Sequence, residues 1–163
     1  MNSTPLLKVS GINKTFINRV GLFRRKPAQV LKDVSFTLEQ GETLALVGET
    51  GSGKSTLAKI LAGVVPPTAG EIEVNGEVIA FEDTQKRCKL IRMIFQDPNS
   101  SLNPQLRVGR ILEAPLRLNT DLTEEERANT VIDTLRMVGL LPEHALFYPQ
   151  MISLGQKQRV ALA

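Results

Sequence analysis

Nine consecutive residues combine an open backbone, hydroxyl groups and one positive charge. The stretch GETGSGKST runs from Gly48 to Thr56 and contains three glycines, Lys54 and the adjacent hydroxyl residues Ser55 and Thr56. Glycine lets the backbone approach a bulky ligand closely because it has no Cβ atom. Backbone N–H groups, an ammonium and hydroxyls are groups that bind phosphate oxygens. The stretch therefore predicts a site for a polyphosphate.

The order of these residues fits the P-loop pattern of nucleotide-binding proteins, G-x-x-x-x-G-K-[ST]. An apolar run at 43–48 predicts a buried strand before the loop, and apolar residues at helical spacing in 55–65 predict a helix after it. A ligand-free Gly/Ser turn would not need that context. We expect Lys54 to bind the β- and γ-phosphates, Ser55 to ligate Mg²⁺ and Thr56 to hold the α/β region. The predicted ATP-binding residues of the loop are Gly48, Glu49, Thr50, Gly51, Ser52, Gly53, Lys54, Ser55 and Thr56.

Composition places the chain among ordinary globular proteins. It has 163 residues, of which 42% are hydrophobic and 23% charged, so it can bury a core. The net charge of +3 is far from that of a nucleic-acid-binding arm, and we expect no nucleic-acid partner. The single cysteine excludes an intramolecular disulfide and fits a reducing compartment. No apolar run reaches the length of a membrane span, so we expect a cytoplasmic protein.

The order of predicted elements is strand-rich first and helical later. Periodicity predicts strands at 6–12, 30–38 and 89–95, a hairpin at 71–79 with Asn75-Gly76 at its turn, and helices at 108–118 and 123–138. The second helix opens with a capping box from Thr123 to Glu126. We predict three segments: a nucleotide-binding core with an antiparallel β subdomain at 1–97, a helical insert at 98–151, and a motif opening a further helix at 152–163.

Two later stretches select one group of P-loop proteins. MIFQDP places Gln96 at the end of a predicted strand, and ISLGQKQR places Ser153, Gly155 and Gln156 at the start of a helix. With the loop, in this order, the chain resembles the ATP-binding subunits of ABC transporters. MIFQDPNSSLNP resembles the oligopeptide and dipeptide branch, and PLRLNTDL, RMVGLLP and GQKQR are similar to Sap-type peptide transporters. The resemblance implies an α/β fold of the ABC-type P-loop NTPase class, with an incomplete parallel core sheet and a helical insert.

The resemblance also implies roles for the later residues. Gln96 would contact Mg²⁺ and the attacking water. Ser153, Gly155 and Gln156 would be signature residues that bind the γ-phosphate of ATP held on a second ATP-binding subunit. Here the usual L-S-G-G-Q reads I-S-L-G-Q, and Leu154 in place of the first glycine could crowd that phosphate.

Phe16 matches the aromatic residue that stacks on adenine in this family, with Phe23 as the competing candidate. The alternative for Phe16 is packing on the core. The resemblance implies two kinds of partner, the membrane subunits and a second ATP-binding subunit. It also implies a peripheral location on the inner face of the cell membrane.

Hydrolysis needs groups that this sequence does not contain. In the family an apolar strand ending in Asp-Glu and a later histidine follow the signature, and no Asp-Glu pair occurs in the 163 residues. We therefore expect the 163 residues to bind ATP without efficient turnover, as the N-terminal portion of a longer ATPase. Three alternatives stay open: a binding-only regulatory fragment, a non-transport ABC ATPase and a P-loop small-molecule kinase.

Overall fold

The computed structural model describes residues 4–20, 24–97 and 101–163. Contacts divide the chain into two compact units, Met1–Met93 and Ile94–Ala163. The predicted boundaries at 97/98 and 151/152 stay a prediction, and residues 98–100 lie outside the described part. The elements are β1 (Leu7–Val20), β2 (Arg24–Leu38), α1 (Lys54–Leu61), β3 (Ala69–Val74), β4 (Glu77–Val78), α2 (Thr84–Leu90), α4 (Val108–Asn119), α5 (Glu124–Met137), η1 (Pro142–Leu146), η2 (Pro149–Met151) and α6 (Leu154–Leu162).

The first unit is built on an antiparallel sheet with the strand order β2-β1-β3-β4. The two long strands pair from Leu7↔Leu38 to Val20↔Arg24, so both extend beyond the predicted ranges. The hairpin of β3 and β4 forms where predicted, and Asn75 and Gly76 both have positive φ at its turn. Two successive residues with positive φ define the type I′ turn that Asn-Gly favours.

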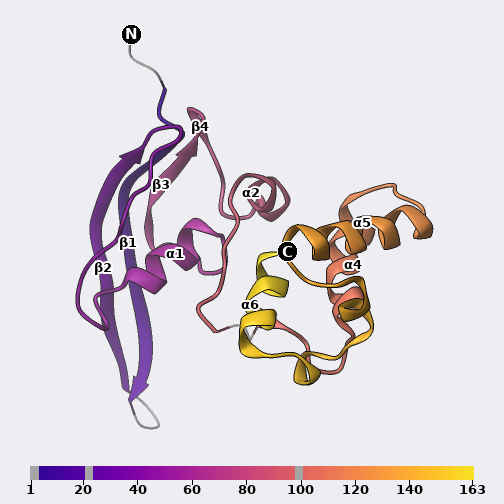
Figure 1. Ribbon diagram of the computed structural model, residues 1–163. Coiled ribbons are helices and arrows are strands. Elements are labelled where there is room, and N and C mark those ends of the chain that lie inside the picture. Colours follow the sequence, from indigo (N-terminus) through magenta and orange to yellow (C-terminus); the bar gives the residue numbers. More distant parts are fainter. Residues whose placement is uncertain (1–3, 21–23, 98–100) are drawn as a thin grey trace. The chain divides into compact units, whose positions relative to one another are not determined.

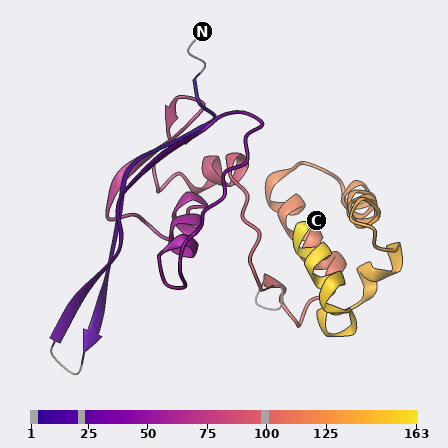
Figure 2. The ribbon, with the colours of Figure 1, turned by 60° about the vertical axis from the view of Figure 1, so that its left-hand side comes forward.

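Helix α1 lies along one face of this sheet (Figures 1 and 2). Its buried residues Leu57 and Ile60 are three positions apart and share one side of the helix. They pack into a core with apolar residues of the three longer strands: Val9, Ile12, Leu31 and Ile72. This packing fixes the helix, and with it the loop that precedes it, against β1 and β2.

The prediction of a buried strand at 43–48 is wrong for the described structure. These residues are irregular, and Leu44, Leu46 and Val47 are exposed, Val47 to 93%. A strand that is apolar on both faces needs a hydrogen-bonded neighbour on each side. The sheet of the described residues contains no strand that pairs with this segment. The parallel part of the predicted core sheet is therefore not formed in the described residues.

The strand predicted at 89–95 is also wrong. Its first two residues belong to α2, whose N-cap Asp83 accepts a hydrogen bond from the Lys86 backbone. The remaining residues up to Phe95 are irregular. Arg87 secures α2 because its guanidinium is buried and donates to the carbonyls of Leu61, Ile79 and Ala80. Burial lowers the pKa of Arg87, although nearby Asp83 favours its charged form.

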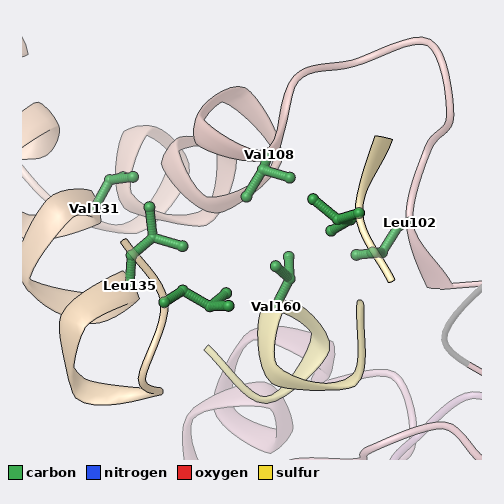
Figure 3. Packing of buried hydrophobic residues seen from close by; sticks show 7 residues of the cluster. Leu102, Val108, Val131, Leu135 and Val160 are labelled. Atoms are coloured by element: carbon green, nitrogen blue, oxygen red, sulfur yellow. The ribbon is translucent and has the colours of Figure 1, made fainter. Parts of the chain in front are cut away.

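The second unit is a small helical body with its own core. Buried side chains from α4, α5 and α6 meet there, as Figure 3 shows for Val108, Val131, Leu135 and Val160, together with Leu102. Both helices predicted at 108–118 and 123–138 form. On the second of these helices, Val131 and Leu135 are buried in this core and Val138 packs against it. Among the described residues, no helix is long and apolar enough to cross a membrane.

Candidate nucleotide-binding site

The P-loop lies between the end of β2 and the start of α1 and is held against β2. Gly53 is the N-cap of α1, with φ 94° and ψ 0°. A Cβ atom at this position would lie 2.7 Å from Leu31 Cδ2 and 2.9 Å from the carbonyl oxygen of Val30. Only glycine combines this left-handed backbone with so close an approach to a neighbouring strand.

Lys54 turns its ammonium back over the loop. Lys54 Nζ donates to the carbonyl oxygens of Gly48 and Glu49, each at 2.7 Å, and to Ser52 Oγ at 3.3 Å. Ser52 N–H donates to Glu49 O at 3.2 Å and closes the turn. These bonds curl the loop into a ring around the ammonium. The positive charge is thereby held where the loop and the helix N-terminus meet.

The first turn of α1 adds unpaired donors beside that charge. The first N–H groups of an α-helix have no intrahelical acceptor, which here applies to Lys54, Ser55 and Thr56. The helix dipole adds a partial positive charge at the same end. Ser55 is exposed, so its hydroxyl is accessible. Ammonium, amides and hydroxyls thus meet in one place, and this donor set suits a polyphosphate.

The described residues suit a Mg²⁺ ion that is bound mainly by the phosphates of the ligand. Within 4–20, 24–97 and 101–163, no three His, Cys, Asp or Glu side chains group so as to hold a metal ion. Mg²⁺ is commonly bound through substrate phosphates and waters with few protein ligands. The Ser55 hydroxyl, at the first turn of α1, can serve as such a ligand.

Phe16 lies on β1 near the strand that supports Gly53. It pairs with Ala28 of β2, and its side chain is 37% exposed. The ammonium of Lys14 lies 4.8 Å from the centre of its ring and donates to the carbonyl of Pro66. The ring is therefore neither buried in the core nor free of contacts. The competing candidate Phe23 lies outside the described residues.

The signature residues open α6 in the second unit. Ser153 is its N-cap, and Ser153 Oγ accepts from Gln156 N–H at 3.3 Å while Gln156 Oε1 accepts from Ser153 N–H at 2.8 Å. This capping box was not predicted, although S-x-x-Q is its sequence signature. Gly155 is exposed with nothing near its missing Cβ, and Leu154 is 56% exposed. The helix N-terminus thus presents an open surface that carries one apolar side chain.

Gln96 also belongs to the second unit. It is exposed and lines a hollow of about 260 Å³ with Ile94, Phe95 and three residues of α6, Gln158, Ala161 and Leu162. The structure therefore brings Gln96 beside α6, and brings Ser153 together with Gln156. The P-loop and Phe16 lie in the other unit.

His144 is a residue that sequence reasoning missed. As the single histidine of the chain, ahead of the signature, it is expected at the surface, yet it is only 8% exposed. Its ring stacks at a tilt on Phe147, with 5.4 Å between centroids. Its Nε2 lies 3.0 Å from Gln156 Nε2. No local sequence signal indicates this contact, because it joins η1 to α6 across twelve positions.

Comparison with known proteins identifies the class to which this loop and fold belong. The model of the ABC transporter family matches residues 31–163, which include the P-loop, Gln96 and the signature. The chain belongs to the ABC transporter family.

Curated relatives place it near two groups of ATP-binding proteins. It is 54% identical over 158 residues to the putrescine export system ATP-binding protein SapF of Escherichia coli K12, covering 97% of this chain and 59% of that protein. The peptide transport system ATP-binding protein SapF of Salmonella typhimurium is 52% identical with the same coverage. The dipeptide transport ATP-binding protein DppF of Haemophilus influenzae is 45% identical, covering 99% of this chain and 50% of that protein. The chain thus spans 50–59% of the length of these relatives.

Solved structures agree with the fold assignment. The ATP-binding cassette MJ0796, described as a dimer in a post-hydrolysis state bound to ADP and Pi, matches with a TM-score of 0.77 and 28% identity, covering 96% of this chain and 67% of that one. CbiO1 of Clostridium perfringens, described as part of an ABC transporter complex, matches with a TM-score of 0.70 and 29% identity, covering 98% and 60%. The expected ABC-type ATPase fold is confirmed.

Proposed function

We propose that the chain is the ATP-binding, energy-coupling subunit of an ABC-type peptide transporter. The observation that carries the proposal is the P-loop itself, in which a glycine at φ 94° delivers Lys54 and the free amides of α1 to one place. The relatives named for peptide and dipeptide transport support the substrate class. In these systems binding and hydrolysis of ATP would drive the transport step.

Different residues of the loop bind different parts of ATP. The backbone from Gly48 to Gly53 lies along the phosphates, and Lys54 leaves its carbonyl partners to bind the β- and γ-oxygens. Ser55 ligates Mg²⁺, which when bound neutralises phosphate charge, and Thr56 binds the α/β region. Glu49, Thr50, Gly51 and Ser52 contribute backbone contacts. Phe16 stacks on the adenine, a role that its partly exposed ring permits.

Hydrolysis would take place between two ATP-binding subunits. Ser153, Gly155 and Gln156 of one subunit face the γ-phosphate held on the P-loop of the other, and Gln96 contacts Mg²⁺ and orients water. The dimer described for the structurally similar cassette supports this arrangement. Leu154, which is exposed in the first turn of α6, makes this half-site the weaker of a pair.

The remaining partners are membrane subunits, against which the helical unit would dock on the cytoplasmic face of the inner membrane. The relatives named for a peptide transport system and for dipeptide transport support a role in a transport assembly. We further propose that the 163 residues alone bind ATP without efficient turnover, because no Asp-Glu pair occurs in them. A binding-only regulatory role and a non-transport ABC ATPase are the competing functions.

The proposal is tested by transport in membrane vesicles. Vesicles from cells that lack the natural protein are compared after complementation with wild type or with Lys54→Ala. ATP-dependent accumulation of a labelled dipeptide should return with wild type and not with Lys54→Ala. Labelled putrescine is measured in parallel, because one relative is named for its export. Transport of putrescine alone would contradict the peptide assignment, and transport of neither would favour a non-transport role.

A further inference from the structure

The side chain of Gln156 is held at both ends. Its Oε1 accepts from the backbone N–H of Ser153 at 2.8 Å, and its Nε2 lies 3.0 Å from His144 Nε2. Ser153 Oγ in turn accepts from Gln156 N–H at 3.3 Å. The amide therefore connects the cap of α6 to the buried ring on η1. Changing the ring must change what Gln156 can bind.

The donors and acceptors of this connection constrain the proton on the ring. A backbone N–H can only donate, so the end of Gln156 facing Ser153 is its oxygen. The other end is then the NH₂ group, which also only donates. His144 Nε2 must accept from it, and a neutral ring that accepts at Nε2 carries its proton on Nδ1.

The other side of the ring can accommodate that proton. The carbonyl oxygen of Leu141 lies 3.1 Å from His144 Nδ1 and can accept from Nδ1–H. The N–H of Leu141 also lies 3.0 Å from Nδ1, a contact that suits the opposite tautomer. Leu141 thus offers a partner to either form, whereas Gln156 offers a partner only to the form with an unprotonated Nε2. The Nδ1–H form therefore requires the N–H of Leu141 to turn away from Nδ1, where it points in the structure.

His144 and Gln156 border a hollow that is open to solvent. A hollow of about 430 Å³ is lined by His144, Ser153, Gly155 and Gln156, together with Arg159 and the turn at 139–141. Arg159 is the charged group of the lining, and its Nη1 donates to the carbonyl of Gly139 at 3.0 Å. The ring is thus buried, while the residues that it orders are accessible.

We propose that His144 is a positioning residue for the nucleotide site formed in trans. Its neutral Nδ1–H tautomer fixes Gln156, and Gln156 fixes Ser153 at the N-terminus of α6. The proposal rests on the proposed function, because it gives these residues the γ-phosphate of the partner subunit as their ligand. His144 itself touches no substrate.

The first test reads the tautomer directly. In long-range ¹H–¹⁵N spectra of the natural protein, the signals of His144 are those missing from His144→Gln. We expect a protonated Nδ1 and an unprotonated Nε2, and a shift toward protonated Nε2 in Gln156→Ala. A ring protonated at Nε2 in the wild type would overturn the proposal, as would a tautomer that does not respond to Gln156→Ala.

The second test uses a matched pair of substitutions. In His144→Gln the side-chain oxygen can occupy the place of Nε2 and still accept from Gln156, whereas His144→Leu has similar bulk and no acceptor. Loss of one neutral hydrogen bond corresponds to about a two- to tenfold effect. We expect His144→Leu to lower ATP turnover and ATP-dependent dimerisation by about this factor, and His144→Gln to retain both. Equal effects of the two would overturn the proposal.

A readout at the P-loop separates this proposal from the proposed function. Binding of ATP to the isolated protomer should be unchanged in His144→Leu, because the ring is far along the chain from Lys54 and acts on the partner's nucleotide. Loss of that binding would show a general folding defect and overturn the positioning role. If Lys54→Ala leaves turnover unchanged, the proposed function fails, while the tautomer measurement still decides the geometry of His144.

Discussion

Gly53 is the residue on which the shape of the proposed ATP site depends most. Its φ of 94° and the 2.7 Å approach to Leu31 leave no room for a side chain. The pattern G-x-x-x-x-G-K-[ST] identifies this position from sequence alone, since the pattern requires a backbone that only glycine adopts. The ring of carbonyls around Lys54 could not be predicted, because it depends on how the loop closes on itself.

Gly53→Ala should therefore weaken ATP binding, with a drop in affinity of about tenfold or more. Gly41→Ala is the matched control, because Gly41 also has a positive φ, 79°, but nothing lies within 4 Å of its missing Cβ. The control carries the left-handed strain of about 1–2 kcal/mol without the collision. Calorimetric titration of both variants checks this. Equal ATP affinities would show that the approach to β2 is unimportant.

Lys54→Ala should weaken ATP binding without abolishing it. One charge-assisted hydrogen bond contributes about 1.5–3 kcal/mol, which corresponds to roughly a ten- to hundredfold loss. The backbone amides of α1 remain in the variant and continue to bind phosphate. Filter binding of labelled ATP measures the difference. An unchanged affinity would mean that the ammonium keeps its bonds to Gly48 and Glu49 in the complex.

At the scale of elements, the two helices predicted at 108–118 and 123–138 form, whereas the strands predicted at 43–48 and 89–95 do not. The helix at 123–138 is specified locally by its capping box and its stripe of Val131 and Leu135. The segment at 43–48 has an equally clear apolar pattern, but a strand needs a partner, and periodicity does not show whether one is present. The same reason applies to 89–95, where α2 begins earlier at a local N-cap.

The capping box of α5 makes the stability of the helical unit depend on pH. The backbone N–H of Thr123 donates to Glu126, as does its hydroxyl, and together they lower the pKa of that carboxyl. Because the folded pKa lies below the unfolded one, the stabilisation is complete above the unfolded value, about 4.3. It is lost as pH falls through the lower folded pKa.

Thermal unfolding should show this dependence. Thr123→Ala should lower the stability of the helix by about 1 kcal/mol at neutral pH, and Thr123→Ser should retain it. Glu126→Gln should show a smaller loss of stability between pH 7 and about pH 3 than the wild type. If both proteins lose the same stability on acidification, Glu126 is not responsible for it.

At the scale of the whole molecule, the two units have separate cores and carry different parts of the proposed site. The P-loop and Phe16 belong to the sheet unit, and Gln96 and the signature belong to the helical unit. The family could be predicted from the order of three motifs, and the branch from its resemblance to the stretch MIFQDPNSSLNP. The contact of Gln156 with His144 could not be predicted, because the two residues lie on different elements, twelve positions apart, and give no periodic signal.

The exposed segment at 43–48 gives a prediction at this scale. The curated relatives are longer, and the chain spans 59% of the Sap-type proteins. When the 163 residues are joined to the part of such a relative that they do not cover, we expect this segment to become a paired strand. Hydrogen exchange at Leu44 and Leu46 should then slow strongly relative to the 163 residues alone. Unchanged exchange would mean that the apolar run forms no strand.

Calorimetric titration of the natural protein with ATP and with AMP, each in the presence of Mg²⁺, tests the central claim most directly. The loop, Lys54 and the start of α1 are proposed to bind the β- and γ-phosphates, which AMP lacks. We predict a saturable heat for ATP and binding of AMP that is weaker by about a hundredfold or more. Equal binding of the two nucleotides, or no binding of ATP, would contradict the account.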